Sequence, residues 1–101
     1  MSPIFDDSKP IFLQIAEKIE DDILEGRLQE GDRVPSTNEF ATFYQINPAT
    51  AAKGVNLLVE EQILYKKRGV GMFVSEKARS LLLAKRKHQF YNDYIAKMLK
   101  E

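Results

Sequence analysis

Two helix-start signals lie close together near the middle of the chain, and their spacing constrains the fold more than any other feature. Ser36 and Glu39 form the pattern of a capping box, in which each side chain accepts a backbone N–H of the other residue. Asn47-Pro48 then supplies a capping amide followed by a proline in the first helical turn. The first of these helices must therefore end near Gln45, leaving a loop of about three residues before the next helix. A short helix, a tight turn and a longer helix form a helix-turn-helix.

An amphipathic helix is expected before this unit. Isoleucine recurs at every fourth position from Ile11 to Ile23, Pro10 fits a first helical turn, and Gly26 ends the pattern. Beyond it, Leu28 and Val34 are expected to pack inward. The charged residues of this helix are expected to face solvent: Glu17, Lys18, Glu20, Asp21 and Asp22.

A β-hairpin is expected after the helix-turn-helix. The third helix should end around residues 61–62, and two short β segments, 63–67 and 72–75, flank a turn with two glycines. Ser75 is a candidate cap for a last helix. The predicted fold class is mainly α with a small β-hairpin wing. We expect a winged helix-turn-helix domain over residues 1–75 and a C-terminal helical dimerisation segment over residues 76–101.

The charge of the chain is unevenly distributed although its net charge is zero. Residues 63–101 contain ten basic and three acidic side chains, and Lys53 is the only charged residue between 40 and 59. This asymmetry suits a DNA-facing surface, because binding depends on where positive charge lies. The alternative is chance segregation of charge among solvated faces.

Several function classes are disfavoured by composition. The 101 residues contain no cysteine, no apolar run of the ~18 residues that span a bilayer, and acidic residues where a signal peptide is basic. We therefore expect a cytoplasmic protein without disulfides or membrane contact. His88 is the only histidine, and no nucleophile with a base or phosphate-cradling glycine loop is evident, so neither an enzyme, a metal site nor a cofactor is expected.

The start of the third helix and the hairpin are the candidate DNA-binding elements. Small and amide side chains would let the backbone approach DNA closely, and exposed N–H groups at residues 48–50 would suit a phosphate. Lys66, Lys67 and Arg68 place positive charge on the wing. Each feature also has a structural interpretation: Asn47-Pro48 as a plain helix start, and the lysines as protection of an edge strand.

The chain resembles the GntR family of bacterial transcription regulators. The matching stretches cover roughly residues 8–75: 10–15, 23–28, 31–36, 47–50, 57–60 and 68–74. The short remainder is similar to the YtrA-like subgroup, in which one or two helices replace a large ligand-binding domain. The resemblance implies a homodimer on a near-palindromic operator of double-stranded DNA, often beside transporter genes, and most simply a repressor.

The resemblance also implies DNA-binding positions, with two departures. Family members commonly carry arginine where this chain has Asn38 and, within the recognition helix, Ala52. We therefore expect fewer guanine contacts, with Asn38 suited to adenine and Lys53 to guanine or phosphate. The candidate DNA-binding residues are Ser36, Asn38, Asn47, Pro48, Ala49, Thr50, Ala52, Lys53, Lys67, Arg68, Gly69 and Gly71.

The apolar C-terminal segment allows three interpretations: dimerisation through helix packing, a pocket for an unknown small-molecule effector, or packing on the winged domain. Dimerisation is favoured, because the apolar side chains exceed what one short domain can cover. The candidate dimerisation residues are Leu81, Leu82, Phe90, Tyr91, Tyr94, Ile95 and Met98. For the whole chain, a DNA-binding regulator is favoured over a winged-helix protein-interaction module that binds no DNA.

Overall fold

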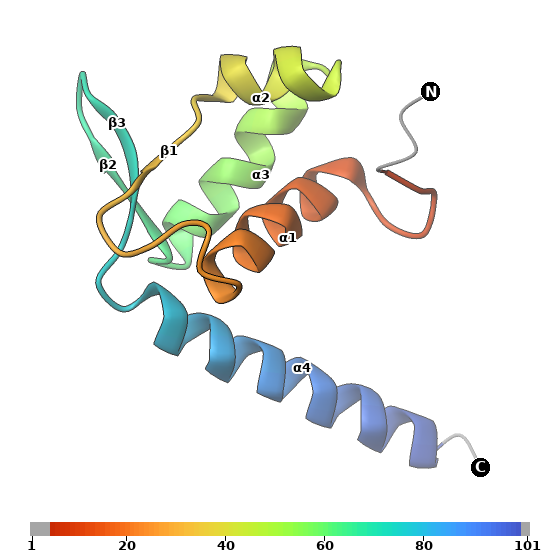
Figure 1. Ribbon diagram of the computed structural model, residues 1–101. Helices are drawn as coiled ribbons and strands as arrows, with labels where there is room; N and C mark the ends of the chain where they lie inside the picture. Colours follow the sequence, from red (N-terminus) through yellow and green to blue (C-terminus); the bar gives the residue numbers. More distant parts are fainter. Residues whose placement is uncertain (1–4, 100–101) are drawn as a thin grey trace.

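The computed structural model describes residues 5–99, which form four helices and one three-stranded sheet (Figure 1). The predicted fold class, mainly α with a small β wing, is confirmed. The elements in chain order are α1 (Ile11–Leu24), β1 (Arg33–Val34), α2 (Thr37–Tyr44), α3 (Pro48–Glu60), β2 (Leu64–Lys67), β3 (Gly71–Val74) and α4 (Ala78–Leu99).

Local hydrogen bonds define the helix-turn-helix as the sequence predicts. Ser36 Oγ accepts the Glu39 N–H at 3.1 Å, and Glu39 Oε1 accepts the Ser36 N–H at 2.8 Å, so the capping box at the start of α2 is present. Gln45 ends α2 in a left-handed conformation with φ of 56°. Asn47 Oδ1 then accepts the Ala49 N–H at 2.8 Å and caps α3.

The sheet contains one strand that the sequence analysis did not anticipate. β2 and β3 form the predicted antiparallel hairpin, and Gly69 lies in its turn with φ of 76°, a value that glycine tolerates best. β1 joins the other edge of β3 through Arg33↔Phe73 and Val34↔Met72, so the strand order is β1-β3-β2. β1 has only two residues, which are too few to show the alternation of apolar and polar residues that predicts a strand. It is a strand because β3 pairs with it.

The core lies between the first three helices and the sheet. Gly54 in α3 sits where α1 crosses, and a Cβ at this position would lie only 2.6 Å from the carbonyl oxygen of Phe12. Glycine therefore permits the close α1–α3 approach. The buried apolar residues are Ile15, Ala16, Ile19, Ile23, Val34, Phe40, Ala41, Ala51, Val55, Leu58, Ile63, Leu64, Val74, Ala78 and Leu82.

The start of α4 corrects two predictions. Ser75 is not the helix cap: its Oγ donates to the carbonyl oxygen of Gln62 at 2.8 Å, and α4 begins only at Ala78. Leu82 is fully buried in the core of its own chain, so its prediction as a dimerisation residue is wrong. The division of the chain at residue 75 stays a prediction, but Ala78 and Leu82 share the core of the winged part.

The distal half of α4 projects away from the rest of the fold (Figure 1). From Lys87 to Met98 every residue is exposed except the half-buried Ile95. Within the part of the chain that the structure describes, no helix combines the length and apolar character needed to cross a membrane.

Candidate nucleic-acid interface

The predicted DNA-binding elements lie along one edge of the molecule. Figure 1 shows the tip of the β2–β3 hairpin, α2 and the start of α3 along the upper edge, with α4 on the opposite side. On α3, Pro48, Ala49 and Lys53 are exposed, whereas Thr50 and Ala52 are half-buried. This edge is thus formed by the two helices of the helix-turn-helix and the wing.

The backbone donors at the start of α3 are already used within the chain. Pro48 has no N–H, the Ala49 N–H donates to Asn47 Oδ1, and the Thr50 N–H donates to the Asn47 carbonyl oxygen at 3.0 Å. The N–H groups of Ala49 and Thr50, expected to be exposed for a phosphate, are therefore hydrogen-bonded within the chain, and their contact with a phosphate stays a prediction. The positive end of the helix dipole remains at this surface and still favours an anion.

Lys53 packs across the recognition helix toward α1. Its Nζ lies 4.2 Å from the centre of the Phe12 ring, a cation–π geometry. A shallow hollow surrounds this contact, and its lining includes Ala49, Ala52 and Asn56. The small alanines leave open surface beside an exposed cation, which suits close approach by a nucleic acid.

The wing presents its cations on a hydrogen-bonded hairpin. Lys66, Lys67 and Arg68 are all exposed, and the Val70 N–H closes the turn by donating to the Lys67 carbonyl oxygen at 2.9 Å. Lys67 Nζ also lies 4.9 Å from the centre of the Phe73 ring, which stacks with Tyr65. Gly69 and Gly71 allow the tight turn that carries these charges.

Arg33 belongs to this edge and is not among the residues predicted from the sequence. Its side chain lies against Gly71, where a Cβ would be 3.0 Å from Arg33 Nε, and its Nη1 is 3.7 Å from Glu39 Oε1. Arg33 thus adds a cation between Gly71 of the wing and Glu39 of α2. Predicting this position of Arg33 would have required recognising β1 as a strand, because the pairing of β1 with β3 brings residue 33 alongside the hairpin.

Glu39 remains an anion on this edge. Hydrogen bonds from the backbone N–H and then the side chain of Ser36, together with Arg33, lower the pKa of the Glu39 carboxyl. Its charge is partly offset by Arg33, so the edge is not uniformly positive.

Part of the basic charge in residues 63–101 is directed away from this edge. Arg79 Nη1 donates to the Leu24 carbonyl oxygen at the end of α1, and both Lys85 and Arg86 form ion pairs with acidic residues of α1. The charge asymmetry therefore reflects two features: a basic wing and the attachment of α4.

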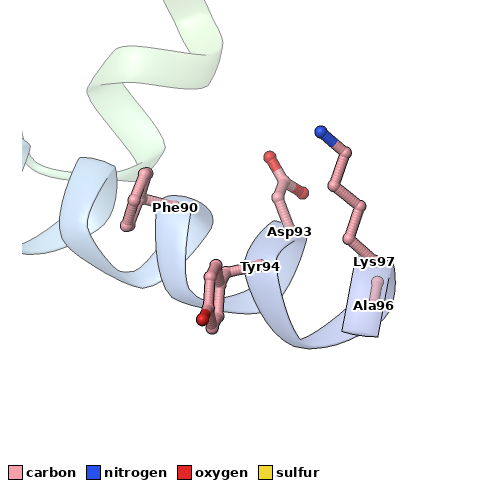
Figure 2. Close-up of a pocket in the computed structure, with 5 residues that line it drawn as sticks. All are labelled: Phe90, Asp93, Tyr94, Ala96 and Lys97. Carbon is pink, nitrogen blue, oxygen red and sulfur yellow. The ribbon is translucent and has the colours of Figure 1, made fainter. Parts of the chain in front are cut away.

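The aromatic side chains of α4 lie around a shallow hollow that one helix supplies. Figure 2 shows Phe90, Asp93, Tyr94, Ala96 and Lys97, all on α4, with Tyr94 pointing away from Asp93 and Lys97. Tyr91 and Met98 are also exposed, Leu81 packs partly against the core, and Ile95 is half-buried. An apolar face on a projecting helix suits helix packing better than the enclosed pocket that a small molecule requires.

Comparison with known proteins identifies the family. The family model for bacterial regulatory proteins of the gntR family matches residues 12–74. The chain belongs to the GntR family. This match spans the helix-turn-helix and the wing, and the family consists of regulatory proteins rather than enzymes.

Individual GntR relatives share both sequence and structure with this chain. The HTH-type transcriptional repressor YtrA of Bacillus subtilis is 37% identical over 76 residues, which are 75% of this chain and 58% of that protein. A GntR family transcriptional regulator from Listeria monocytogenes superposes with a TM-score of 0.82 at 35% identity, covering 95% of this chain and 86% of the other.

A DNA complex also lies among the similar structures. AraR(DBD) in complex with operator ORX1 has a TM-score of 0.65 to this chain at 27% identity, covering 74% of this chain and 90% of the other. A fold similar to that of this chain therefore occurs in a solved complex with operator DNA.

Proposed function

We propose that this chain is a sequence-specific DNA-binding transcription regulator, most simply a repressor, that binds a near-palindromic operator as a homodimer. The observation that supports this most is that the exposed start of α3 and a basic wing lie along the same edge of the molecule. The repressor role is supported by the relative YtrA, and the DNA partner by the AraR complex.

The homodimer is supported by the distal half of α4. Its exposed apolar side chains follow helical spacing, and an exposed apolar face of this kind is typical of an interaction surface. Two copies packed through α4 would present two recognition helices to two half-sites. A two-fold symmetric dimer reads a near-palindromic sequence for this reason.

Within each half-site, we propose that Asn38, Thr50 and Lys53 contact base edges. Asn38 and Lys53 are exposed, and an amide suits adenine whereas an ammonium suits the acceptors of guanine. Asn47 holds the start of α3 and acts on DNA through the helix it caps. The remaining α3 residues, Pro48, Ala49 and Ala52, provide close approach rather than base recognition.

The Lys53→Ala variant tests base recognition. We expect a loss of about 1–3 kcal/mol against the duplex that the protein selects from a random-sequence library, and a smaller loss against scrambled duplex. Titrations of both duplexes in one buffer measure this difference. Lys77→Ala removes an exposed lysine that lies before α4, outside this edge and outside the proposed dimer face, and should change neither affinity. Equal losses on both duplexes for Lys53→Ala would make Lys53 a phosphate contact.

The wing lysines should contribute affinity without sequence preference. Lys66→Ala with Lys67→Ala should weaken selected and scrambled duplexes alike, because charges on the wing meet the DNA backbone. The slope of log affinity against log salt should fall by about 0.9 for each phosphate that the variant no longer neutralises. Lys77→Ala removes an exposed lysine outside the edge and outside the proposed dimer face, and its slope should match the unaltered protein. An unaltered slope in the wing variant would mean that these lysines face solvent.

Titration of duplex DNA at two salt concentrations also separates the regulator from a protein-interaction module. A regulator binds the selected duplex more tightly than scrambled DNA at both concentrations. A module that binds only proteins has no such preference. The existence of a small-molecule effector stays a prediction.

A further inference from the structure

One carboxylate is buried in a way that neither DNA binding nor the apolar core requires. The side chain of Glu20 is 3% exposed, and Glu20 is the only buried charged residue between residues 5 and 98. The helical pattern of α1 predicts that Glu20 faces solvent with its acidic neighbours, and this prediction is wrong. A buried carboxylate is costly unless it is paired and hydrogen-bonded.

Two cationic side chains of α4 form ion pairs with the Glu20 carboxylate. Lys85 Nζ lies 2.6 Å from Glu20 Oε2 and 2.8 Å from Glu61 Oε1, so it connects α4 to both α1 and the end of α3. Arg86 Nη2 lies 3.2 Å from Glu20 Oε1 and 2.8 Å from Asp21 Oδ1. We call these five residues the Glu20 cluster.

The charged form of the cluster is favoured. Burial alone would lower the pKa of Lys85, but its hydrogen bonds to Glu20 and Glu61 outweigh burial and raise that pKa. Burial opposes the charge of Arg86 as well, and hydrogen bonds to Asp21 and Glu20 again raise the pKa. Both cations therefore stay charged at neutral pH.

The cluster sits where α4 leaves the body of the fold. Ala78 and Leu82, about two turns and one turn earlier, are buried in the core, whereas residues from Lys87 onward are exposed apart from Ile95. The cluster is thus the last attachment before the projecting half. The helix rises 1.5 Å per residue, so the segment beyond the cluster is about 18 Å long, and a tilt of about 10° would move its end by about 3 Å.

We propose that the Glu20 cluster sets the angle between α4 and the DNA-binding edge, and thereby the half-site spacing that the dimer accepts. This inference rests on the proposed α4-mediated homodimer. Buried ion pairs contribute little net stability compared with apolar residues of similar size, and in some proteins buried polar groups instead select one structural arrangement over others. In a dimer joined through α4, this arrangement determines how far apart the two α3 helices lie.

The test varies operator spacing. Half-sites are first identified from duplexes that the unaltered protein selects from a random library. Duplexes are then made with the selected spacing, with one or two base pairs added between the half-sites, and with a single half-site. Glu20→Gln removes the charge with little change in size. Glu17→Gln is the matched control, because Glu17 lies on the same helix, is more exposed and pairs with Lys9 rather than with α4.

We expect the unaltered protein and Glu17→Gln to lose about tenfold or more in affinity for each altered spacing, since bivalent binding fails when geometry prevents simultaneous contact. Glu20→Gln should bind all spacings within about threefold of one another. Its affinity for the single half-site and its dimeric mass should not change. A variant that was merely less stable would instead bind every duplex more weakly.

A second variant and a second measurement guard against misfolding of Glu20→Gln. Lys85→Met keeps the aliphatic stem, removes the α4 partner and should relax the spacing preference in the same way. Because the chain has no cysteine, spin labels can be placed at Thr42→Cys on α2 and Gln89→Cys on α4, both exposed. Labelled chains diluted with unlabelled protein should show a broader label-to-label distance distribution in either cluster variant.

The outcomes are distinguishable. Retention of the original spacing preference and a narrow distance distribution in Glu20→Gln would overturn this inference and leave the proposed function intact. Failure of the unaltered protein to select any duplex, or to dimerise, would overturn the proposed function and the inference with it.

Discussion

The double substitution Tyr91→Glu and Tyr94→Glu is expected to convert the proposed dimer into a monomer and to lower operator affinity by about 10²–10⁴-fold. Both tyrosines are exposed on the apolar face of α4. Two carboxylates per chain on that face would have to lose water and repel their symmetry mates. The affinity falls because each winged domain then binds its half-site without the other.

Light scattering at micromolar concentration and titration of the selected duplex measure the two effects. Gln89→Glu with Asn92→Glu is the matched control, since it adds the same charge at the same spacing on exposed positions of the same helix. This control should remain dimeric and bind the operator. A tyrosine variant that still has the mass of two chains would show that the dimer interface lies elsewhere.

The helix-turn-helix was predictable because its signals are local. A capping box needs only Ser36 and Glu39, and the start of α3 needs only Asn47-Pro48, so each boundary is encoded within a few residues. The hairpin was predictable for the same reason, through its glycines. Such features do not depend on which distant segment packs against them.

The wrong predictions concern residues whose structure depends on contacts with segments that are far away in the sequence. Arg33 and Val34 form a strand because β3 lies beside them, and Ser75 loses its capping role because its hydroxyl donates to Gln62. Glu20 has the same local pattern as its acidic neighbours, and only the docking of α4 buries it. Spacing along one helix could not reveal this contact between residues that are 65 positions apart.

The candidate interface shows the same division. The exposed cations of the wing follow from a run of charged residues beside a turn, which sequence alone reveals. The bond from the Ala49 N–H to Asn47 Oδ1 also follows from the capping amide that the sequence predicts. By contrast, Lys53 contacts Phe12 only because α1 crosses α3 at Gly54.

Adjacent leucines on α4 offer the sharpest test of how this helix is attached. Leu82 is 0% exposed and Leu83 is 53% exposed, although their sequence environments are nearly the same. Leu82→Ala should lower the free energy of unfolding by about 2–5 kcal/mol, because it removes buried methyl groups and leaves a cavity in the core.

Leu83→Ala is the matched control, with the same chemical change one residue later. Both variants are made in the Tyr91→Glu, Tyr94→Glu background, where the protein is expected to be monomeric and unfolding does not depend on protein concentration. In this background, Leu83→Ala should change the free energy of unfolding by no more than about 0.5 kcal/mol. Urea unfolding followed by circular dichroism measures both values. Similar losses for the two leucines would mean that α4 does not dock on the core through Leu82. A loss confined to Leu82→Ala would establish that α4 begins as part of the winged domain and only its distal half is available to a second chain.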